Sequence, residues 1–369
     1  MQTFDVAVVG AGLVGAAVAR ELVDAGYRTV VFERNAEPAG TSTRANAGIL
    51  RSGFDAIPTS LEARLMRRQN ARLPQVFDRL RIPYQTIGAL VLATAPGEIS
   101  AFERTVSRAE ENGISLIPID RARLRLLEPG ANARAALLAE GEAITDPFEM
   151  TRRLLADVPV YYETLVERIE GRKHSALLGL PAAVVGARAV VNCAGRGAES
   201  LAADGAFELH MQTCEYVAYA PTEPPQLKRI LVRMRTDGER GVEVFPTLYG
   251  YLCAGPGRHG LRDLRGDAAH LLPVLSALPP AGAWKGRRPA PAPQDYVIEW
   301  SPRVPALLNV VPMRGSVLST CLGIARHVRD LLIERTIRPR APQLAVETRE
   351  FDAARPWWQR GHPPRREVS

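Results

Sequence analysis

The apolar and polar positions at the start of the chain predict a strand, a helix and a second strand in close succession. An apolar run at residues 6–9 leads into a glycine-rich turn, and helical periodicity then continues to Leu22 and Val23. A second apolar run, at residues 27–32, ends at Glu33. Such a βαβ unit predicts an α/β fold that contains a parallel sheet.

The glycines of the turn have the spacing G-x-G-x-x-G. Gly10 allows the tight turn, Gly12 lets the backbone approach a pyrophosphate, and Gly15 permits close packing of helix against strand. The N–H groups at the start of the helix suit the phosphates. Glu33 is placed to accept hydrogen bonds from both ribose hydroxyls, and its carboxylate would repel a 2′-phosphate. The unit therefore predicts an FAD or NAD site and disfavours NADP.

Length and charge narrow the class of protein. A chain of 369 residues with 46% hydrophobic residues has enough material for two domains. The net charge of +7 suggests nucleic-acid binding, but 44 of the 47 basic residues are arginine and the excess is dispersed, so we expect no such interface. We also expect no signal peptide and no transmembrane segment. These features predict a cytoplasmic protein, with peripheral attachment to a membrane left open.

The cysteines are Cys193, Cys214, Cys253 and Cys321, which stand far apart and form no C-x-x-C pair. Metal and iron–sulfur sites usually need closer spacing. We therefore expect four buried, reduced thiols and no metal site.

The chain after Glu33 distinguishes between the two cofactors. A nicotinamide dehydrogenase would continue into further βα units, whereas residues 40–55 are polar and glycine-rich. This stretch resembles the flavin-binding loop of the D-amino-acid-oxidase-like FAD oxidoreductases. The resemblance is greatest to the branch that holds FAD-dependent glycerol-3-phosphate dehydrogenase and L-2-hydroxyglutarate dehydrogenase, and it implies FAD as the cofactor.

Further motifs of that branch follow in the same order. They include S-L-E-A-R-L at residues 60–65, D-P-F-E-M at 146–150, N-x-A-G at 192–195, P-T-x-x-G at 246–250 and an arginine-containing segment at 309–320. The resemblance implies a Rossmann-type FAD-binding domain from residues 1–80, 145–200 and 305–337. A discontinuous, mainly antiparallel β substrate domain would take residues 81–144 and 201–304, with a basic tail at 338–369. The prolines between residues 273 and 295 predict a loop or connector there.

The same resemblance implies a set of cofactor-binding residues. These are Gly10, Gly12, Leu13, Val14, Gly15, Glu33, Arg34, Thr41, Ser42, Arg44, Asn46, Ala47, Gly48, Val166, Cys193, Ala194, Gly195, Arg314, Gly315, Ser316, Leu318 and Ser319.

The chain departs from the family pattern where the family usually has a histidine beside the flavin. Arg51 stands there, and an arginine is too basic to serve as a general base. Arg51 could hold a substrate carboxylate or phosphate, or form an ion pair without chemistry. His259 is an alternative base by motif position, or it is simply solvated. Arg314 is retained and could contact a substrate anion or form a structural salt bridge.

Two further features leave alternatives open. Tyr249 could bind substrate, although such tyrosines more often pack. Longer relatives continue past an arginine- and proline-rich linker into a cysteine-rich iron–sulfur module, and we expect this chain to lack it. The pair Trp357 and Trp358 in the corresponding tail could anchor a partner subunit, or the tail could fold back on its own domain.

The resemblance implies an enzyme, an FAD-dependent dehydrogenase or oxidase. It would transfer a hydride to flavin N5 from a small anionic 2-hydroxy acid or a glycerol-3-phosphate-like alcohol. The missing histidine leaves an amino-acid or amine oxidase of the same fold as an alternative. A flavin-bearing subunit of a heteromeric dehydrogenase and a flavoprotein with altered chemistry are further alternatives. The electron acceptor could be oxygen, a quinone or a partner electron-transfer subunit.

Overall fold

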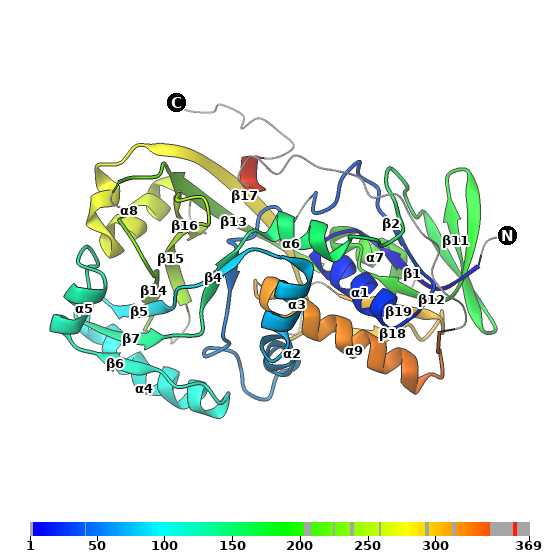
Figure 1. Ribbon diagram of the computed structural model, residues 1–369, viewed down its shortest axis with the longest axis horizontal. Helices are drawn as coiled ribbons and strands as arrows, with labels where there is room; N and C mark the ends of the chain where they lie inside the picture. Colours follow the sequence, from blue (N-terminus) through cyan, green and yellow to red (C-terminus); the bar gives the residue numbers. More distant parts are fainter. Residues whose placement is uncertain are drawn as a thin grey trace.

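The chain folds around two eight-stranded sheets that lie side by side, as the computed structural model shows (Figure 1). The structure describes residues 3–40, 42–202, 207, 209–223, 226–236, 240–257, 260–291, 295–311, 315–339 and 357–359.

The first sheet holds the βαβ unit predicted at the start of the chain. Its main path runs in the order β10-β11-β12-β1-β2-β9, and β19 pairs with both β12 and β18. The pairs β1·β12, β1·β2, β2·β9 and β12·β19 are parallel. The strands are β1 (Thr3–Val9), β2 (Thr29–Phe32), β9 (Val160–Tyr161), β10 (Arg168–Arg172), β11 (Ser175–Leu180), β12 (Ala183–Asn192), β18 (Ile298–Trp300) and β19 (Leu307–Val310).

Helices α1 (Leu13–Asp24) and α9 (Cys321–Glu334) pack against each other beside this sheet (Figure 1). Apolar side chains of α1, such as Leu22 and Val18, are fully buried in the core that includes Val6 and Val8 of β1. This burial explains the 3.6-residue periodicity of the helix and the continuous apolar run of the strand, because parallel strands are covered on both faces.

The second sheet is mainly antiparallel, and only the β14·β5 pair within it is parallel among the described pairings. Its order is β17-β13-β16-β15-β14-β5-β7-β6. The strands are β5 (Ala89–Ala93), β6 (Ile117–Ile119), β7 (Ala135–Ala139), β13 (Leu209–Tyr219), β14 (Ile230–Met234), β15 (Arg240–Pro246), β16 (Leu252–Gly257) and β17 (Pro280–Pro291). The predicted fold class, an α/β protein with a mainly antiparallel second sheet, is confirmed.

A small third sheet and several short helices complete the described fold. The sheet has the order β3-β8-β4, with β3 (Ile49–Leu50), β4 (Tyr84–Thr86) and β8 (Ala143–Thr145). The remaining helices are α2 (Leu61–Asn70), α3 (Leu73–Leu80), α4 (Pro96–Glu111), α5 (Arg121–Leu127), α6 (Pro147–Leu154), α7 (Ala198–Ala202), α8 (Leu261–Leu271), η1 (Gly195–Gly197), η2 (Pro273–Ser276), η3 (Val317–Ser319) and η4 (Trp357–Gln359).

The prediction of a loop or connector at residues 273–295 was wrong for much of that stretch. Residues 280–291 form β17, which pairs with β13 along nearly its whole length. Prolines are tolerated there because β17 is the edge strand of the second sheet, so one side of its backbone has no ladder to complete. Among the described residues of this stretch, η2 at residues 273–276, the bend before β17 and Asp295 match the expectation.

Strands of the two large sheets alternate along the chain. The first sheet draws on residues 3–32, 160–192 and 298–310, and the second on residues 89–139 and 209–291. Strand β18 joins the first sheet although it precedes the domain boundary drawn at residue 305. The division into domains stays a prediction.

All four cysteines are buried and none forms a disulfide, as predicted. Burial raises the pKa of the Cys321 thiol to about 12, which keeps this thiol protonated at neutral pH. Within the described part of the chain, no helix combines the length and the hydrophobicity that a bilayer crossing requires.

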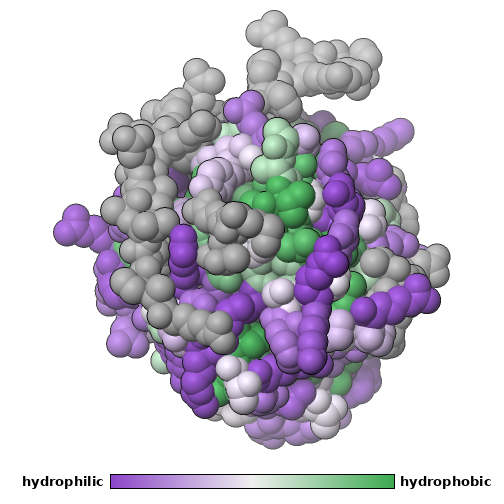
Figure 2. Space-filling model, turned by 90° about the vertical axis from the view of Figure 1, so that its right-hand side faces the viewer, coloured by the Kyte–Doolittle hydropathy of each residue, from purple (hydrophilic) through white to green (hydrophobic). Residues whose placement is uncertain are grey.

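Figure 2 views the end of the molecule that carries β11, where apolar side chains form a patch among mostly hydrophilic ones. Exposed apolar residues of the neighbouring strands and loops include Tyr161, Leu165 and Val184.

The contact between α2 and α9 depends on the absence of a side chain at Gly323. A Cβ atom there would lie 2.0 Å from the carbonyl oxygen of Leu65. We expect Gly323→Ala to destabilise the protein by at least about 1–3 kcal/mol, the usual cost of overpacking a core. Gly266→Ala in α8 is the control: a Cβ there meets nothing within 4 Å, and it should stabilise the helix by about 0.5–1 kcal/mol. Urea unfolding measures both changes, and equal stabilities of the two variants would contradict the packing argument.

Candidate active site

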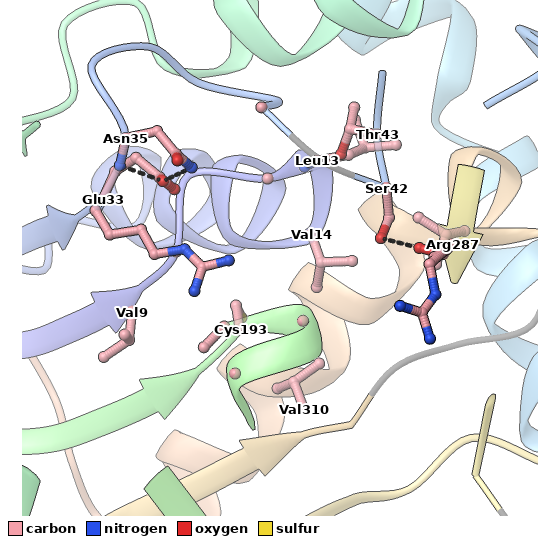
Figure 3. A pocket seen from close by; sticks show the side chains of 18 of the residues that line it. Val9, Leu13, Val14, Glu33, Asn35, Ser42, Thr43, Cys193, Arg287 and Val310 are labelled. Carbon is pink, nitrogen blue, oxygen red and sulfur yellow. Dashed lines mark hydrogen bonds between the residues drawn. The ribbon is translucent and has the colours of Figure 1, made fainter. Parts of the chain in front are cut away.

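A long pocket opens at the carboxyl ends of β1, β2 and β12 and at the start of α1 (Figure 3). This is where a Rossmann-type sheet binds a dinucleotide. The lining includes Val9, Gly10, Gly12, Leu13, Val14, Phe32, Glu33, Arg34, Asn35, Gly40, Ser42, Thr43, Ala45, Asn46, Thr164, Leu165, Val166, Cys193, Ala194, Gly195, Gly197, Ser200, Leu201, Cys214, Tyr216, Gly286, Arg287, Val310, Gly315 and Val317.

The three glycines of the first turn have the roles that their spacing predicts. Gly10 has a φ of +100°, and a Cβ there would lie 2.6 Å from the carbonyl oxygen of Cys193. A Cβ at Gly15 would lie 1.9 Å from the carbonyl oxygen of Gly10, so helix and turn are in direct contact. A Cβ at Gly12 would meet only the Thr43 hydroxyl, at 3.6 Å. Gly12 thus borders open space, as a site for a pyrophosphate requires.

The start of α1 suits an anion. Gly12 is its N-cap and supplies no side-chain hydrogen bond to the helix. The Leu13 N–H donates to the Thr43 hydroxyl at 3.1 Å, and Gly12, Leu13 and Val14 line the pocket. Unsatisfied N–H groups at a helix N-terminus bind phosphate oxygens well.

Glu33 lies at the other end of the pocket, at the end of β2 (Figure 3). One carboxylate oxygen accepts from the Ala11 N–H at 2.8 Å, and the other accepts from the backbone and side-chain nitrogens of Asn35. These bonds fix the carboxylate at the position where a ribose is expected.

The opposite wall comes from the second sheet. The Ser42 hydroxyl donates to the carbonyl oxygen of Arg287 in β17 at 2.9 Å (Figure 3). A Cβ at Gly286 would lie 2.2 Å from the side chain of Ala45, so β17 touches the 42–48 loop. The prolines between residues 273 and 295 predict a loop, so the sequence contains no local signal for this wall.

Most predicted cofactor residues that the structure describes line the pocket, and some lie behind its wall. Ser316 and Ser319 are buried. The Ser316 hydroxyl donates to the Glu62 carboxylate and bonds to the Tyr296 hydroxyl, and the Ser319 hydroxyl accepts from the Arg51 N–H. Gly15, Ala47, Gly48 and Leu318 do not line this pocket either, and Arg44 lines an adjoining one. Thr41, His259 and Arg314 lie outside the described residues.

A network of buried charges lies where the chain leaves β3. The Arg51 guanidinium binds both carboxylate oxygens of Glu243 in β15, at 2.7 and 2.8 Å. Arg240 binds the same carboxylate at 2.9 Å and both oxygens of Asp55 at 2.5 and 3.0 Å. Glu142 is fully buried, 3.5 Å from Arg240. Of the two alternatives for Arg51, the ion pair is therefore present, and it occupies one edge of the guanidinium.

Charge pairing sets the protonation of this network. Burial alone would raise the pKa of the Asp55 carboxyl, but the Arg240 and Arg51 guanidiniums lower that pKa to about 2. Burial also opposes ionisation of Glu243, yet the same two arginines lower its pKa. Burial and Arg240 favour the neutral form of Arg51, but Glu243 and Asp55 outweigh them and raise its pKa. Arg51 is a permanent cation and cannot take up a substrate proton.

Tyr249 contacts another residue of its own chain. Its hydroxyl donates a short hydrogen bond to Asp146, which caps the N-terminus of α6 through the N–H groups of Phe148 and Glu149. This contact joins the β15–β16 turn to α6, as expected for a packing residue.

A second pocket adjoins the first and shares Gly40, Ser42, Ala45, Gly286 and Arg287 with it. We call its four basic residues, Arg44, Arg196, Lys285 and Arg287, the basic mouth. Arg44 pairs with Glu37, and Lys285 pairs with Glu215 at 2.6 Å. Within the described residues, Arg196 and Arg287 form no ion pair, and both are exposed. The rings of Trp284 and Trp358 complete the lining.

The profile of the FAD-dependent oxidoreductase family, which includes D-amino-acid oxidase, matches residues 5–331 of the chain. The chain belongs to this family. It is an FAD-dependent enzyme, and the pocket fits the cofactor: the open side of Gly12 and the start of α1, whose N-cap residue has no side chain, suit the diphosphate, and Glu33 suits the ribose.

Relatives within the family match this chain at low identity, one over most of it and another over less than half of it. Glycerol 3-phosphate dehydrogenase of Caloramator mitchellensis is 24% identical over 89% of this chain and 74% of its own length. L-2-hydroxyglutarate dehydrogenase of Caenorhabditis elegans is 31% identical, over 42% of this chain and 36% of its own.

Among solved structures, the FAD-bound L-α-glycerophosphate oxidase of Mycoplasma pneumoniae has a TM-score of 0.82 at 24% identity, covering 90% of this chain and 95% of that one. Glycine oxidase of Geobacillus kaustophilus has a TM-score of 0.80 at 22% identity, covering 93% and 97%. These two structural similarities show that the chain shares the fold of those proteins.

FAD binding should depend on the open space in front of Gly12. We expect Gly12→Ala to fold normally, because its Cβ meets only Thr43, and to weaken FAD binding by about 10- to 100-fold, as about 1–3 kcal/mol of overpacking implies. Gly97→Ala in α4 is a matched control, since its Cβ would also meet a single side-chain atom at 3.6 Å. Titration of apoprotein with FAD measures the dissociation constants, and equal values for the two variants would remove Gly12 from the site.

The Arg51–Glu243 pair should be a major determinant of stability. We expect Arg51→Met to cost about 3–5 kcal/mol, because it leaves Glu243 short of a buried partner, and Glu243→Gln added to it should restore part of that loss. The control is Arg68→Met, which breaks an exposed pair with Asp330 and should cost less than about 1 kcal/mol. Denaturant unfolding measures each variant. Additive effects of the Arg51 and Glu243 substitutions would show that the two residues do not interact.

Proposed function

We propose that this FAD-dependent oxidoreductase oxidises a small anionic alcohol, a 2-hydroxy acid or a glycerol-3-phosphate-like compound. The basic mouth beside the FAD pocket supports this proposal most directly. Arg196 and Arg287 are exposed there and form no ion pair with any acidic residue that the structure describes, so an anion that approaches the pocket is attracted. Relatives that act on glycerol 3-phosphate and L-2-hydroxyglutarate add support from sequence.

FAD held in this pocket would supply the redox chemistry, as an acceptor of a hydride at N5. The protein binds and orients the substrate. In this proposal the basic mouth attracts the substrate anion, and Arg314 contacts it. The buried Arg51–Glu243 pair keeps the adjoining strands in place. His259 is the proposed base for the hydroxyl proton, since Arg51 cannot accept one.

The alternative substrate class is an amino acid or another amine, and Arg51 is the observation that favours it. The family histidine is replaced by a cation whose guanidinium binds Glu243. An uncharged amine can lose a hydride from carbon without first losing a proton from oxygen, so it needs no base at this position. Oxygen, a quinone and a partner subunit are the electron acceptors that the proposal allows.

Anaerobic spectral titration of the holoprotein separates the substrate classes. We expect glycerol 3-phosphate or a 2-hydroxy acid, such as 2-hydroxyglutarate or lactate, to bleach the visible flavin band, while glycine and proline do not. Bleaching by amino acids alone would overturn the alcohol proposal in favour of the amine. Readmission of oxygen, or addition of a soluble quinone, then identifies the acceptor.

Charge removal at the basic mouth tests how the anion is attracted. Arg196→Gln and Arg287→Gln should each raise the half-saturating concentration of the bleaching anion by about two- to fivefold, the scale of an exposed charge interaction. Salt should reduce the difference from the unsubstituted protein. Arg168→Gln, an exposed arginine in β10, is the control and should change nothing. Unchanged saturation in both mouth variants would exclude the mouth from substrate binding.

A further inference from the structure

Two tryptophans from near the end of the chain join the walls of the candidate active site. Residues 357–359 form η4, which lies between the two large sheets near β17 (Figure 1, red). Trp357 is buried, with 1% of its surface exposed, and Trp358 is half-buried. Of the two alternatives for this tail, the described residues show the one in which it folds back on its own chain.

Trp357 holds the 42–48 loop. Its indole N–H donates to the carbonyl oxygen of Asn46 at 3.1 Å, and Asn46 lines the FAD pocket. A Cβ at Gly48 would lie 3.0 Å from the Trp357 ring, so ring and loop are in close contact. Ala39 and Phe148 pack on the ring as well. The loop that borders the cofactor is thus fixed by a residue 311 positions away in the sequence.

Trp358 continues a row of aromatic rings that reaches the FAD pocket. It stacks on Trp284 of β17 with ring centroids 5.3 Å apart, and Trp284 stacks on Tyr216 of β13 at 5.0 Å. Tyr216 lines the FAD pocket, whereas Trp284 and Trp358 line the basic mouth. Trp358 is fixed from two sides by rings that lie nearly perpendicular to it. Its ring centroid is 5.3 Å from that of Tyr251 and 4.6 Å from that of Trp357.

We propose that Trp358 is a specificity-determining residue that limits the size of the anions reaching the FAD pocket, with Trp357 as the residue that positions it. As in the proposed function, on which this role depends, the basic mouth is taken as the route of the substrate. The cations of the mouth attract anions of any size. The rigid indole wall on one side then admits small anions and excludes bulky ones.

Replacement of Trp358 should change which sizes of molecule reach the FAD pocket. This access can be measured without knowing the substrate, from the rates at which oxidants of different size reoxidise the reduced holoprotein. The reduced holoprotein is mixed with ferricyanide, a bulky trivalent anion that takes one electron per ion, or with molecular oxygen, which is small and neutral. We expect Trp358→Ala to raise the rate of reoxidation by two equivalents of ferricyanide several-fold and to change the oxygen rate much less. Trp358→Phe should restore part of the selectivity.

Trp300→Ala is the matched control, because Trp300 is also half-buried but packs on Arg335, at 4.3 Å, beside the first sheet. An equal ferricyanide-to-oxygen ratio in the unsubstituted protein and Trp358→Ala would overturn the proposal, as would an equal change in Trp300→Ala. Suppose that Trp358→Ala changes the ferricyanide-to-oxygen ratio but that neither 2-hydroxy acids nor glycerol 3-phosphate reduce the protein. This result would support the size-limiting role of Trp358 and contradict the proposed substrate class.

The positioning role of Trp357 has a separate readout in the apoprotein. Trp357→Phe keeps the ring but removes the N–H donor to Asn46, so the FAD dissociation constant should rise about fivefold, the value of one hydrogen bond. Circular dichroism confirms that the variant is folded. An unchanged dissociation constant together with an unchanged ferricyanide-to-oxygen ratio would show that the contact with Asn46 positions nothing.

Discussion

The structure depends on how the first sheet and its cofactor loop are held against the second sheet. Buried charge has a large part in this. Arg51 directly follows β3, Glu243 lies within β15, and their bidentate pair is 16% and 1% exposed at the two side chains. Loss of the charge on either residue would leave the charge on the other buried in protein, which solvates it poorly. The pair therefore joins the segment that follows β3 to β15 of the second sheet.

That constraint explains why a permanent cation occupies a position where the family usually has a histidine. A histidine can change its protonation near neutral pH, and the buried Glu243 would then lose one of its two cationic partners when the ring became neutral. Arginine keeps its charge at every accessible pH, and Glu243 raises its pKa further. At this position the chain favours a fixed charge that organises the interface over a group that can exchange protons.

The sequence predicted the half of the site whose determinants are local. Gly10, Gly12, Gly15 and Glu33 lie within one βαβ unit, so their spacing alone carries the geometry of the cofactor pocket. The other half comes from residues that meet only in the folded protein. The partner of Arg51 is 192 residues away, and no spacing rule could choose between its ion pair and a substrate contact. The wall at β17 was missed because its prolines favour a loop unless the strand is known to be an edge.

The groups that attract an anion and the groups that can accept a proton affect the chemistry differently. The charge of the basic mouth favours an anion but does not distinguish a hydroxy acid from an amino acid, because both carry a carboxylate. That distinction depends on where a proton can go. An alcohol needs an acceptor for its hydroxyl proton as the carbon loses a hydride, and Arg51 can provide none. An uncharged amine carries its own lone pair and needs no such acceptor. If the substrate is an anion, as proposed, its class would therefore be decided by the proton-accepting groups of the site, because the anion-binding groups would select only for negative charge.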